Sequence, residues 1–193
     1  MNISSSKSKP NLYKINFYLR LKRLSWTMVY YIFFRFSPIP FFKWRLFLLN
    51  LFGANVHKNA RVYPSVKVWL PSNLIMYSGA TMGPNVNCYN CALVEIGKNS
   101  TISQGTVLCT GTHQPNLKDI KLSPVMPLKV ASIKIGDYVW LAMNVFVHPG
   151  VSVDNSSIVG ACSVVTKSLS SNAIFSGFPA EYICSRDQID QKN

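Results

Sequence analysis

Residues 135–165 read IGDYVWLAMNVFVHPGVSVDNSSIVGACSVV, and an aliphatic side chain recurs there at every sixth position. The six positions are Ile135, Leu141, Val147, Val153, Val159 and Val165. Aliphatic residues fill only roughly a quarter of positions in ordinary proteins, so six successive matches at one spacing are not a chance pattern. This period matches neither an α-helix nor the alternation of a simple strand. It is typical of a parallel β-helix, in which each hexapeptide makes one short strand and one turn.

The same period runs through the preceding part of the chain, with changes of phase. One phase contains Val56, Val62, Val68, Leu74, Ala80, Val86 and Ala92, and a second contains Ile96, Ile102 and Leu108. We expect these side chains to point inward, because stacked coils bury a continuous apolar column. A change of phase indicates an insertion, and the largest lies between Leu108 and Ile135. This stretch contains His113, Pro115, Pro124 and Pro127 and fits no strand pattern. We therefore expect a loop over residues 109–132 that leaves the coil.

The chain of 193 residues suits one domain with an extension. Residues 1–53 are basic and aromatic and predict a helical extension, with helices at about 12–36 and 40–51. Pro38 and Pro40 separate the two, since proline cannot continue a helix. The β-helix is expected over 54–184, and 185–193 form a tail. Residues 169–184 lose the hexapeptide pattern and are expected to fold back along the coil.

Charge is distributed very unevenly along the chain. The sequence has 20 basic and 7 acidic residues, and twelve basic residues precede the first acidic one, Glu95. Such asymmetry indicates an anionic partner. No nucleic-acid-binding motif accompanies it, so we expect no nucleic acid as partner. An anionic membrane surface fits better, because the basic residues are interleaved with aromatic ones. The alternative is that the helices only cap the end of the β-helix.

Contact with a membrane is expected to be peripheral. The longest uncharged apolar run is Trp26–Phe34, far short of the ~20 residues of a spanning helix. The chain starts without a signal-peptide pattern and has an odd number of cysteines, five, so we expect reduced thiols in the cytoplasm or at the inner membrane face. Cys88 and Cys91 form a lone pair with no second pair, which favours two small coil residues over a metal site.

Several motifs resemble one family of enzymes. Residues Ile102-Ser103-Gln104 and Leu108-Cys109-Thr110-Gly111-Thr112-His113 resemble the segment around the catalytic histidine of the colanic acid biosynthesis acetyltransferases, which are hexapeptide-repeat acyltransferases. Val139-Trp140 and Gly177-Phe178-Pro179-Ala180 follow in the family's order, and the resemblance covers about residues 20–185. It implies an all-β, left-handed parallel β-helix assembled as a homotrimer. Acetyl-CoA, the co-substrate, would lie in a groove between adjacent subunits, and no metal is implied.

His113 is the expected catalytic residue. Acetyl transfer to a sugar hydroxyl requires removal of the hydroxyl proton, and an imidazole suits this task near neutral pH. The resemblance implies that His113 is the general base of direct transfer in a ternary complex. Without the resemblance, the alternative for a single loop histidine is a solvated surface group. The family often has Asp after this histidine, whereas this chain has Gln114. Glu95 or a backbone carbonyl is therefore the candidate that orients the imidazole.

Asn87 and Asn90 are candidates for contact with the acceptor, together with Glu95. Related enzymes place a turn asparagine near the acceptor sugar at this point of the sequence. The alternative is structural, because asparagine is favoured in tight turns.

The first cofactor-binding candidates lie in the uninterrupted hexapeptide repeats that begin at Ile135. In the family, a tryptophan at the place of Trp140 packs near the histidine and the CoA arm. Alternatively, Trp140 is an outward aromatic that covers a neighbour's coil. If Trp140 instead belongs to the site, Ala142 and Met143 would offer backbone groups to the pantetheine arm.

The remaining cofactor candidates lie further along the chain. Gly160-Ala161 and Thr166-Lys167 resemble the family's cofactor stretch, where a small residue lets pantetheine approach the backbone. Lys167 is expected to meet a CoA phosphate, unless it is a solvated lysine at the end of a coil. Glu181 occupies the place where the family has a basic residue, so Arg186 is the expected substitute.

The sequence thus predicts an acetyl-CoA-dependent O-acetyltransferase that acts on a sugar hydroxyl of a surface polysaccharide or its precursor. An amino sugar or an antibiotic is the alternative acceptor. A zinc-dependent β-helix hydrase would need His57, His113 and His148 as ligands. That class has closely clustered histidines, whereas these three are widely separated along the chain. A non-catalytic hexapeptide scaffold has no need for a loop of this kind around a histidine.

Overall fold

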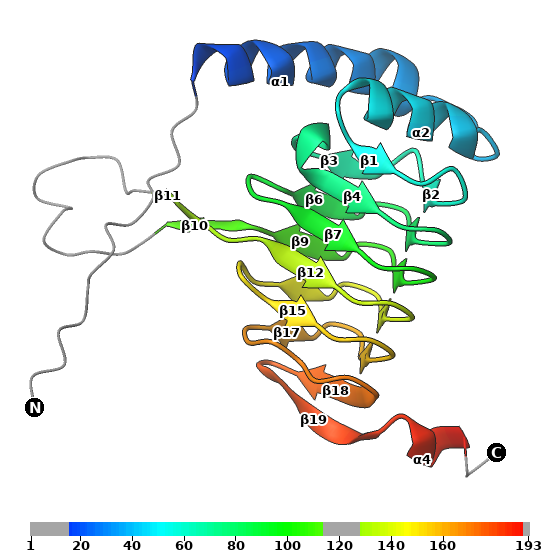
Figure 1. The fold of residues 1–193 in the computed structure, drawn as a ribbon, viewed down its shortest axis with the longest axis vertical. Helices are drawn as coiled ribbons and strands as arrows, with labels where there is room; N and C mark the ends of the chain where they lie inside the picture. Colours follow the sequence, from blue (N-terminus) through cyan, green and yellow to red (C-terminus); the bar gives the residue numbers. More distant parts are fainter. Residues whose placement is uncertain (1–15, 114–127, 191–193) are drawn as a thin grey trace, which may run out of the picture.

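The computed structural model of the chain describes residues 16–113 and 128–190. It is a parallel β-helix whose short strands stack into three faces, with helices across its N-terminal end (Figure 1). The first face stacks β1 (Asn55–Val56), β4 (Leu74–Met76), β7 (Val94–Ile96), β12 (Ile133–Ile135) and β15 (Ser152–Val153). The third face stacks β3 (Lys67–Val68), β6 (Asn87–Tyr89), β9 (Val107–Cys109), β14 (Phe146–Val147) and β17 (Val164–Val165).

The second face is longer than the other two. It stacks β2 (Arg61–Val62), β5 (Thr81–Met82), β8 (Thr101–Ile102), β13 (Trp140–Leu141), β16 (Ile158–Val159) and β18 (Ala173–Gly177), and ends with β19 (Ala180–Ser185). The chain visits the first, second and third faces in turn, so each full circuit adds one strand to each face.

The interior of the β-helix is the apolar column that the period of six predicts. Ile135, Leu141, Val147, Val153, Val159 and Val165 are each exposed by 1 % or less. Parallel pairing places them in line with residues of earlier coils, for example Ile96 beside Ile135 and Leu108 beside Val147. Each such aliphatic side chain contributes about 1.5–3 kcal/mol when it is fully buried. The hexapeptide prediction is therefore confirmed for this part of the chain.

The first two coils differ from the prediction, because their phase changes earlier than the sequence suggests. The inward strand residues after Val68 are Met76, Met82 and Cys88, which pair in line with Val56, Val62 and Val68. The first coil, from Val56 to Met76, is two residues longer than the coil from Ile135 to Val153 (76 − 56 against 153 − 135), and the second, from Met76 to Ile96, is as long as the first.

This change of phase cannot be recognised from the spacing of apolar residues in the sequence. Leu74, Ala80 and Val86 are also buried, each two residues before an inward strand position. Ala92 is half-buried. Aliphatic residues therefore stand at both kinds of position, and the period of six in the sequence continues across the extra residues.

Two of the three corners are tight and use left-handed backbone. Between the first and second faces, residues such as Gly79, Asn99 and Tyr138 have positive φ. Between the second and third faces, Gly105 and Asn144 do so. Glycine and asparagine adopt this conformation most readily. Gly105 has no room for a side chain either, because its Cβ would meet Oδ1 of Asn144 in the next coil.

The corner between the third and first faces, here called the wide corner, takes up all the extra residues. It is formed by residues 69–73 in the first coil, which include the 3-10 turn η2 (Pro71–Asn73), and by residues 90–93 in the second. In the third coil it gives rise to an arm, formed by β10 (Gly111–His113) and β11 (Leu128–Val130). The arm projects sideways from the β-helix in Figure 1.

Helices cover the N-terminal end of the column. They are α1 (Phe17–Val29), the π-helical turn η1 (Tyr30–Phe34) and α2 (Phe42–Leu51). Asn16 begins α1, since its Oδ1 accepts a hydrogen bond of 2.8 Å from the Leu19 backbone N–H. Leu46, Leu48 and Leu49 of α2 belong to the same buried cluster as Val56. Helices lie where the sequence predicts them, although residues 12–15 of the first prediction are outside the described ranges.

Arg45 fixes the turn between these helices to the β-helix. Its side chain is fully buried, and its Nε donates to the carbonyl of Val62 over 2.6 Å. Its Nη1 and Nη2 donate to the carbonyls of Pro38 and Ile39, over 2.8 and 2.6 Å. A guanidinium with five donors in a fixed plane suits this cluster of carbonyls.

The C-terminal end departs partly from the prediction. β18 continues the coil, since it pairs in parallel with β16 and places Phe175 in line with Val159. This last coil is two residues shorter than the one before it, which runs from Leu141 to Val159 (175 − 159 against 159 − 141). Only β19 turns back, pairing antiparallel with β18. The short helix α4 (Asp187–Asp190) follows.

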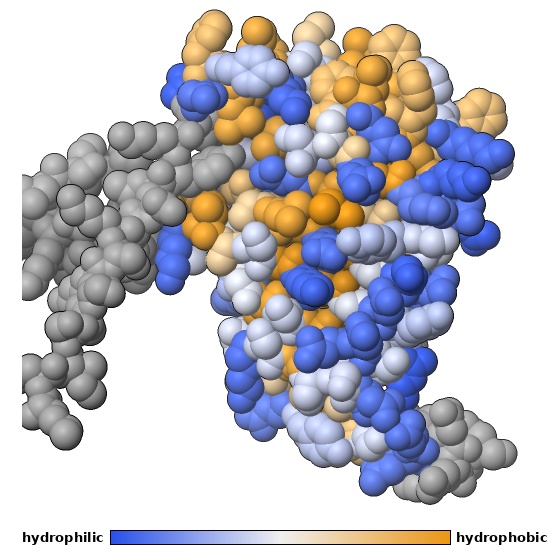
Figure 2. Space-filling view, viewed as in Figure 1, coloured by the Kyte–Doolittle hydropathy of each residue, from blue (hydrophilic) through white to orange (hydrophobic). Residues whose placement is uncertain are grey.

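The helical end has an unusually apolar surface. Figure 2 shows hydrophobic side chains gathered over the helices at the top of the molecule, with hydrophilic ones over most of the β-helix below. We call this surface the helical cap; its exposed large apolar residues are Phe17, Tyr18, Leu21, Leu24, Met28, Tyr31, Ile32, Phe33, Phe36, Ile39, Phe41, Trp44, Phe47 and Leu51. Within the described part of the chain, no helix has both the length and the apolar character required to cross a bilayer.

Candidate active site

His113 lies on the arm, at the end of β10. The two strands pair antiparallel, with Gly111 opposite Val130 and His113 opposite Leu128. The Ala131 N–H donates to the Thr110 carbonyl over 2.9 Å and closes the base of the arm. The side chains of Thr112 and His113 are exposed. The sequence predicts only a loop here, and three-residue strands are too short to give a pattern. Gln114 and the three prolines lie outside the described residues.

Aromatic side chains of the third face support the base of the arm. A Cβ at Gly111 would meet Cε1 of Tyr89 at 3.4 Å and Cδ1 of Leu128 at 3.5 Å, so the backbone packs closely there. The Tyr89 ring meets Trp69 edge-on, with centroids 5.6 Å apart. Burial, with a hydrogen bond to Cys91, raises the pKa of Tyr89 to about 12. Tyr89 is therefore a neutral packing group at ordinary pH.

Asn87 lies on the same face as these aromatics. It is on β6 with its side chain exposed, and it pairs in register with Lys67 of β3 and Val107 of β9. Since β9 leads directly into the arm, Asn87 is one strand away from the strand that positions His113. The structure thus places Asn87 on the strand next to β9, at the end opposite the wide corner from which the arm leaves.

Asn90 does not fit the predicted contact with an acceptor. Its side chain is fully buried at the wide corner. Its Oδ1 accepts from the Leu70 N–H over 2.9 Å, and its Nδ2 donates to the carbonyls of Leu70 and Asn73 over 2.8 and 3.1 Å. All of these partners are backbone groups of the preceding coil. Asn90 therefore joins two coils and has no surface to offer a sugar.

Glu95 lies on the other side of the wide corner, on β7 of the first face. It is half-buried between Ile75 and Lys134 on the neighbouring strands. It is hydrogen-bonded to Tyr77, and this bond with the carboxylate's charge raises the pKa of Tyr77 above its ordinary value. A polar hollow of about 290 Å³ adjoins these side chains and also includes Asp137.

The predicted cofactor residues begin on a different face from His113. Trp140 lies on β13 of the second face, 49 % exposed, and its Nε1 donates to Ser103 Oγ over 3.0 Å. Ala142 is buried, and its N–H donates to the Val159 carbonyl over 2.9 Å. The next coil therefore already uses the N–H of Ala142, and the prediction that Ala142 offers a backbone group to pantetheine stays a prediction. The Met143 carbonyl accepts from the Cys162 N–H over 2.9 Å, while its side chain is exposed.

Another part of the same chain fills the space that a side chain at position 160 would need. A Cβ at Gly160 would be 2.7 Å from Ser176 Oγ and 3.0 Å from Ser176 Cβ. The Gly160 N–H also donates to the Phe175 carbonyl over 2.8 Å. The space that a side chain at position 160 would need is thus occupied by β18, and contact of Gly160 with pantetheine stays a prediction. Ala161 is exposed in the turn that follows.

The last three candidates lie at two different corners. Thr166 and Lys167 are exposed at the wide corner, just after β17. Arg186 lies between the first and second faces, where its Nη1 donates to the carbonyls of Tyr138 and Ser156 over 3.1 and 3.0 Å. Taken together, the predicted cofactor residues surround the β-helix, and a single chain does not bring them to one site.

The remaining cysteines and histidines occupy separate positions. Cys88 points into the column, and burial raises its pKa above the ordinary value. His57 follows β1, while His148 follows β14 and meets Phe146 edge-on at 5.2 Å. Over residues 16–113 and 128–190, no three side chains of metal-ligating type gather at one place.

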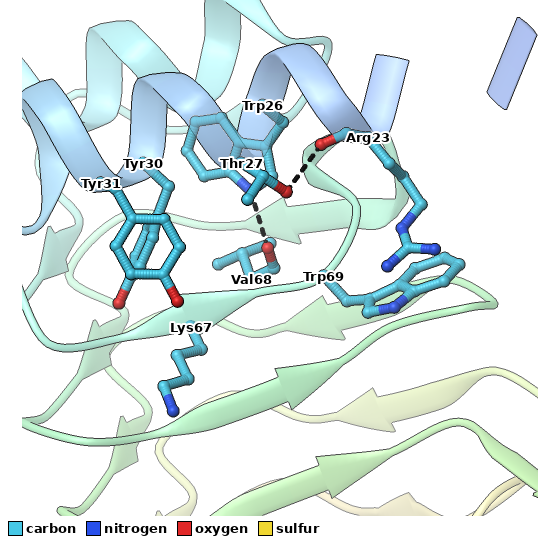
Figure 3. A pocket seen from close by; sticks show the side chains of 8 residues that line it. All are labelled: Arg23, Trp26, Thr27, Tyr30, Tyr31, Lys67, Val68 and Trp69. Carbon is cyan, nitrogen blue, oxygen red and sulfur yellow. Dashed lines mark hydrogen bonds between the residues drawn. The ribbon is translucent and has the colours of Figure 1, made fainter. Parts of the chain in front are cut away.

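A hollow that no sequence motif predicts lies at the upper end of the third face. It is situated between α1 and β3, has a volume of about 210 Å³, and is lined by residues including Arg23, Tyr30, Lys67 and Trp69 (Figure 3). Its residues come from the extension and the first coil, so no local motif identifies it. Only the uneven charge of the sequence points to this end of the molecule.

Comparison with known proteins identifies the family. Residues 132–167 match the family "Bacterial transferase hexapeptide (six repeats)". The chain is 40 % identical over 161 residues to the "Putative colanic acid biosynthesis acetyltransferase WcaF" of Escherichia coli K12, covering 83 % of this chain and 85 % of that protein.

Two solved structures share the fold. A maltose O-acetyltransferase from Clostridium difficile 630 superposes with a TM-score of 0.79 at 21 % identity, over 88 % of this chain and 89 % of the other. A galactoside acetyltransferase in complex with coenzyme A superposes with a TM-score of 0.77 at 27 % identity, over 92 % of this chain and 87 % of the other. The stacked hexapeptide coils, the arm with its histidine and these similarities together show that the chain belongs to the bacterial hexapeptide-repeat transferases, as an acetyltransferase.

Proposed function

We propose that this acetyltransferase moves an acetyl group from acetyl-CoA to a hydroxyl of a saccharide, with His113 as the general base. The observation that carries the proposal is the exposed His113 on an arm that continues from β9, the strand paired with β6 and its exposed Asn87. The similar WcaF is named for colanic acid biosynthesis, and the similar galactoside acetyltransferase was solved with coenzyme A. Both names support a sugar acceptor and a CoA donor.

The proposed reaction needs one base and no covalent enzyme intermediate. The imidazole of His113 takes the proton of the acceptor hydroxyl while its oxygen attacks the thioester carbonyl. The carbon–sulfur bond then breaks, and the CoA thiolate receives the proton from the imidazolium. Asn87, with a donor and an acceptor in one amide, is suited to hold a neighbouring hydroxyl of the sugar. Holding both substrates together supplies much of the acceleration.

We propose that the donor site is formed between copies of the chain in a homotrimer. Lys167 lies at the wide corner, and Trp140 and Arg186 lie at or beside the corner between the first and second faces. Packing the wide corner of one copy against another face of the next would bring such residues together around CoA. Sedimentation equilibrium should then give a mass three times that of the 21.7 kDa chain. A monomer that retains full activity would contradict this arrangement.

We also propose that the helical cap makes peripheral contact with an anionic membrane. Fourteen large apolar side chains are exposed there, and the same part of the sequence has no acidic residue. Such a combination is typical of helices that lie in the membrane interface. The acceptor would then be a surface polysaccharide precursor held at that interface.

The catalytic role of His113 is tested by substitution. His113→Ala is expected to lower the rate of CoA thiol release with a saccharide acceptor by about 10²- to 10⁴-fold, because the hydroxyl proton loses its acceptor. Thr112→Ala changes the neighbouring exposed residue and serves as the matched control. The acceptor panel should pair sugars with amino sugars. Equal rates in the two variants would refute the role of His113, and transfer only to amines would refute the choice of acceptor.

A further inference from the structure

The hollow between α1 and β3 has the size of a site for one chemical group. Its volume of about 210 Å³ is below the ~300–1,000 Å³ of typical pockets for whole small molecules. Figure 3 shows Arg23 stacked over Trp69 on one side and the hydroxyl ends of Tyr30 and Tyr31 on the other, near Lys67. The hollow therefore suits part of a ligand whose remainder lies along the third face.

Tyr30 has an unsatisfied hydroxyl in this hollow. The residue is only 6 % exposed, and its buried oxygen has no hydrogen-bond partner. The ring is held in place by stacking on Phe34, with centroids 5.6 Å apart. Buried polar atoms nearly always have a partner, and leaving one without costs stability. A rigid donor of this kind points to an acceptor oxygen supplied from outside the chain.

The charged groups of the hollow determine the kind of ligand. The guanidinium carbon of Arg23 lies over the Trp69 ring, 3.9 Å from its centroid, so the guanidinium already covers the face of the ring on which a sugar would stack. A stacked guanidinium still presents its N–H groups in its own plane. Lys67 adds a second cation, and the sequence has no acidic residue before Glu95. Two cations and a phenolic donor together favour an anion rich in oxygen, such as a phosphate.

The hollow also lies within reach of the candidate active site. Lys67 pairs in register with Asn87, and Trp69 contacts Tyr89, on which the base of the arm packs. Neighbouring strands are about 4.8 Å apart, so β9 and the arm begin roughly 10 Å from β3. That distance is comparable to one sugar ring with its glycosidic phosphate.

We propose that this hollow binds the phosphate group attached to the acceptor saccharide and so places the sugar ring beside Asn87 and His113. The inference rests on the proposed function for the identity of the acceptor. A phosphate next to a sugar occurs both in lipid-linked and in nucleotide-linked saccharides. The hollow opens beside the helical cap, so either source can present the same group.

The test measures binding without acetyl-CoA, so that catalysis plays no part. Glucose, galactose and their 1-phosphates are each titrated into the full chain in a calorimeter. The affinity of each 1-phosphate is then compared with that of its parent sugar. We expect at least one 1-phosphate to bind at least about tenfold more tightly than its parent sugar, which is the effect of one charge-assisted hydrogen bond. Lys67→Gln and Tyr30→Phe are each expected to remove this advantage.

Control variants distinguish binding at a specific phosphate site from general electrostatic attraction to a basic protein. Lys58→Gln removes a cation that lies outside the hollow and should leave the advantage of the phosphate unchanged. Tyr30→Phe removes one buried oxygen only, so the ligand-free variant should have an equal or higher Tm. The inference is overturned if no 1-phosphate binds better than its sugar, or if all three variants bind alike.

A second arm of the experiment identifies the source of the phosphate. A uridine diphosphate hexose in solution is compared with a polyprenyl-phosphate hexose in phosphatidylcholine vesicles, using the same variants. The ligand whose binding is weakened by Lys67→Gln is assigned to the hollow. If Lys67→Gln weakens the binding of neither ligand, the inference is overturned. A chain that binds hexose phosphates but transfers no acetyl group would refute only the proposed function. Acetyl transfer with no preference for phosphate would refute only this inference.

Discussion

At the scale of single residues, Gly160 leaves no room for a side chain because β18 of the same chain fills the space. Gly160→Ala would place a Cβ 2.7 Å from Ser176 Oγ, so one of the two coils must shift. We expect a loss of about 1–3 kcal/mol in the free energy of unfolding, measured by urea denaturation. The KM for acetyl-CoA should stay unchanged in the folded variant.

Ala161→Ser is the matched control for this substitution, because Ala161 is exposed. It should leave stability nearly unchanged. A Gly160→Ala variant of full stability with a clearly raised KM for acetyl-CoA would support the role in pantetheine binding that the sequence suggests.

Tyr89 predicts a dependence of stability on alkaline pH. Its pKa is raised from 10.0 to about 12, chiefly by burial. The folded state therefore holds this proton more tightly than the unfolded state, and the resulting stability is fully present below pH 10. It is lost as the pH rises toward about 12. Urea denaturation should show that Tyr89→Phe loses less stability over this range than the parent chain.

Tyr182→Phe, at an exposed tyrosine near the other end of the β-helix, provides the comparison. It should follow the parent chain across the same pH range. If Tyr89→Phe also follows the parent chain, the phenol of Tyr89 ionises equally in both states.

Asn87 and Asn90 show what the sequence can and cannot predict at this scale. Both are acceptor candidates by sequence, and turn chemistry is the alternative for each. The two extra residues in each early coil give the two asparagines different positions, since they place Asn87 on a strand and Asn90 in a buried corner. Spacing alone does not reveal those residues, because Leu74, Ala80 and Val86 continue the apolar period across the insertion.

At the scale of elements, the arm is attached to the β-helix without being needed for its stacking. β12 pairs directly with β7 and β15, and β9 pairs with β6 and β14. Replacing residues 111–130 with a single glycine would shorten the third coil, from Ile96 to Ile135, to the length of the coil from Met76 to Ile96. We expect far-UV circular dichroism and Tm close to those of the parent chain, but no acetyl transfer.

The control for the arm is His113→Ala within the intact arm. Both variants should transfer acetyl groups at least about 10²-fold more slowly than the parent chain, and both should remain folded. An unfolded arm-deleted variant would show that the arm contributes to the core, and an active one would remove His113 from the mechanism.

The elements differ in how well the sequence predicts them. The β-helix is predictable because every coil repeats the same local rule, an inward aliphatic residue followed by a turn. The helices are predictable from their prolines and apolar content. The strands of the arm are not, because each is very short and even their nearest paired residues, His113 and Leu128, are far apart along the chain.

At the scale of the whole molecule, the two ends have different surfaces. The helical cap is apolar and its part of the sequence is basic, whereas most of the β-helix surface is polar (Figure 2). We expect the chain to sediment with vesicles that contain anionic lipid, and to be released as salt is raised, since ions screen the basic residues. Substituting Phe33→Ser and Phe36→Ser together should weaken sedimentation severalfold.

Phe178→Ser is the matched control, because Phe178 is 82 % exposed but lies at the opposite end of the β-helix. It should sediment like the parent chain. If it loses as much binding as the cap variant, apolar exposure in general causes the association. The distribution of the cofactor candidates around the corners also belongs to this scale, because their spacing in the sequence does not show on which face of the β-helix each one lies.

The wide corner has a practical consequence for this scaffold. The first two coils insert a few extra residues there and the third inserts the whole arm, while the stacking of the strands continues undisturbed. The other two corners hold the repeat in register, so this edge tolerates segments of very different length. Segments of other lengths can therefore be inserted at this edge without redesigning the core.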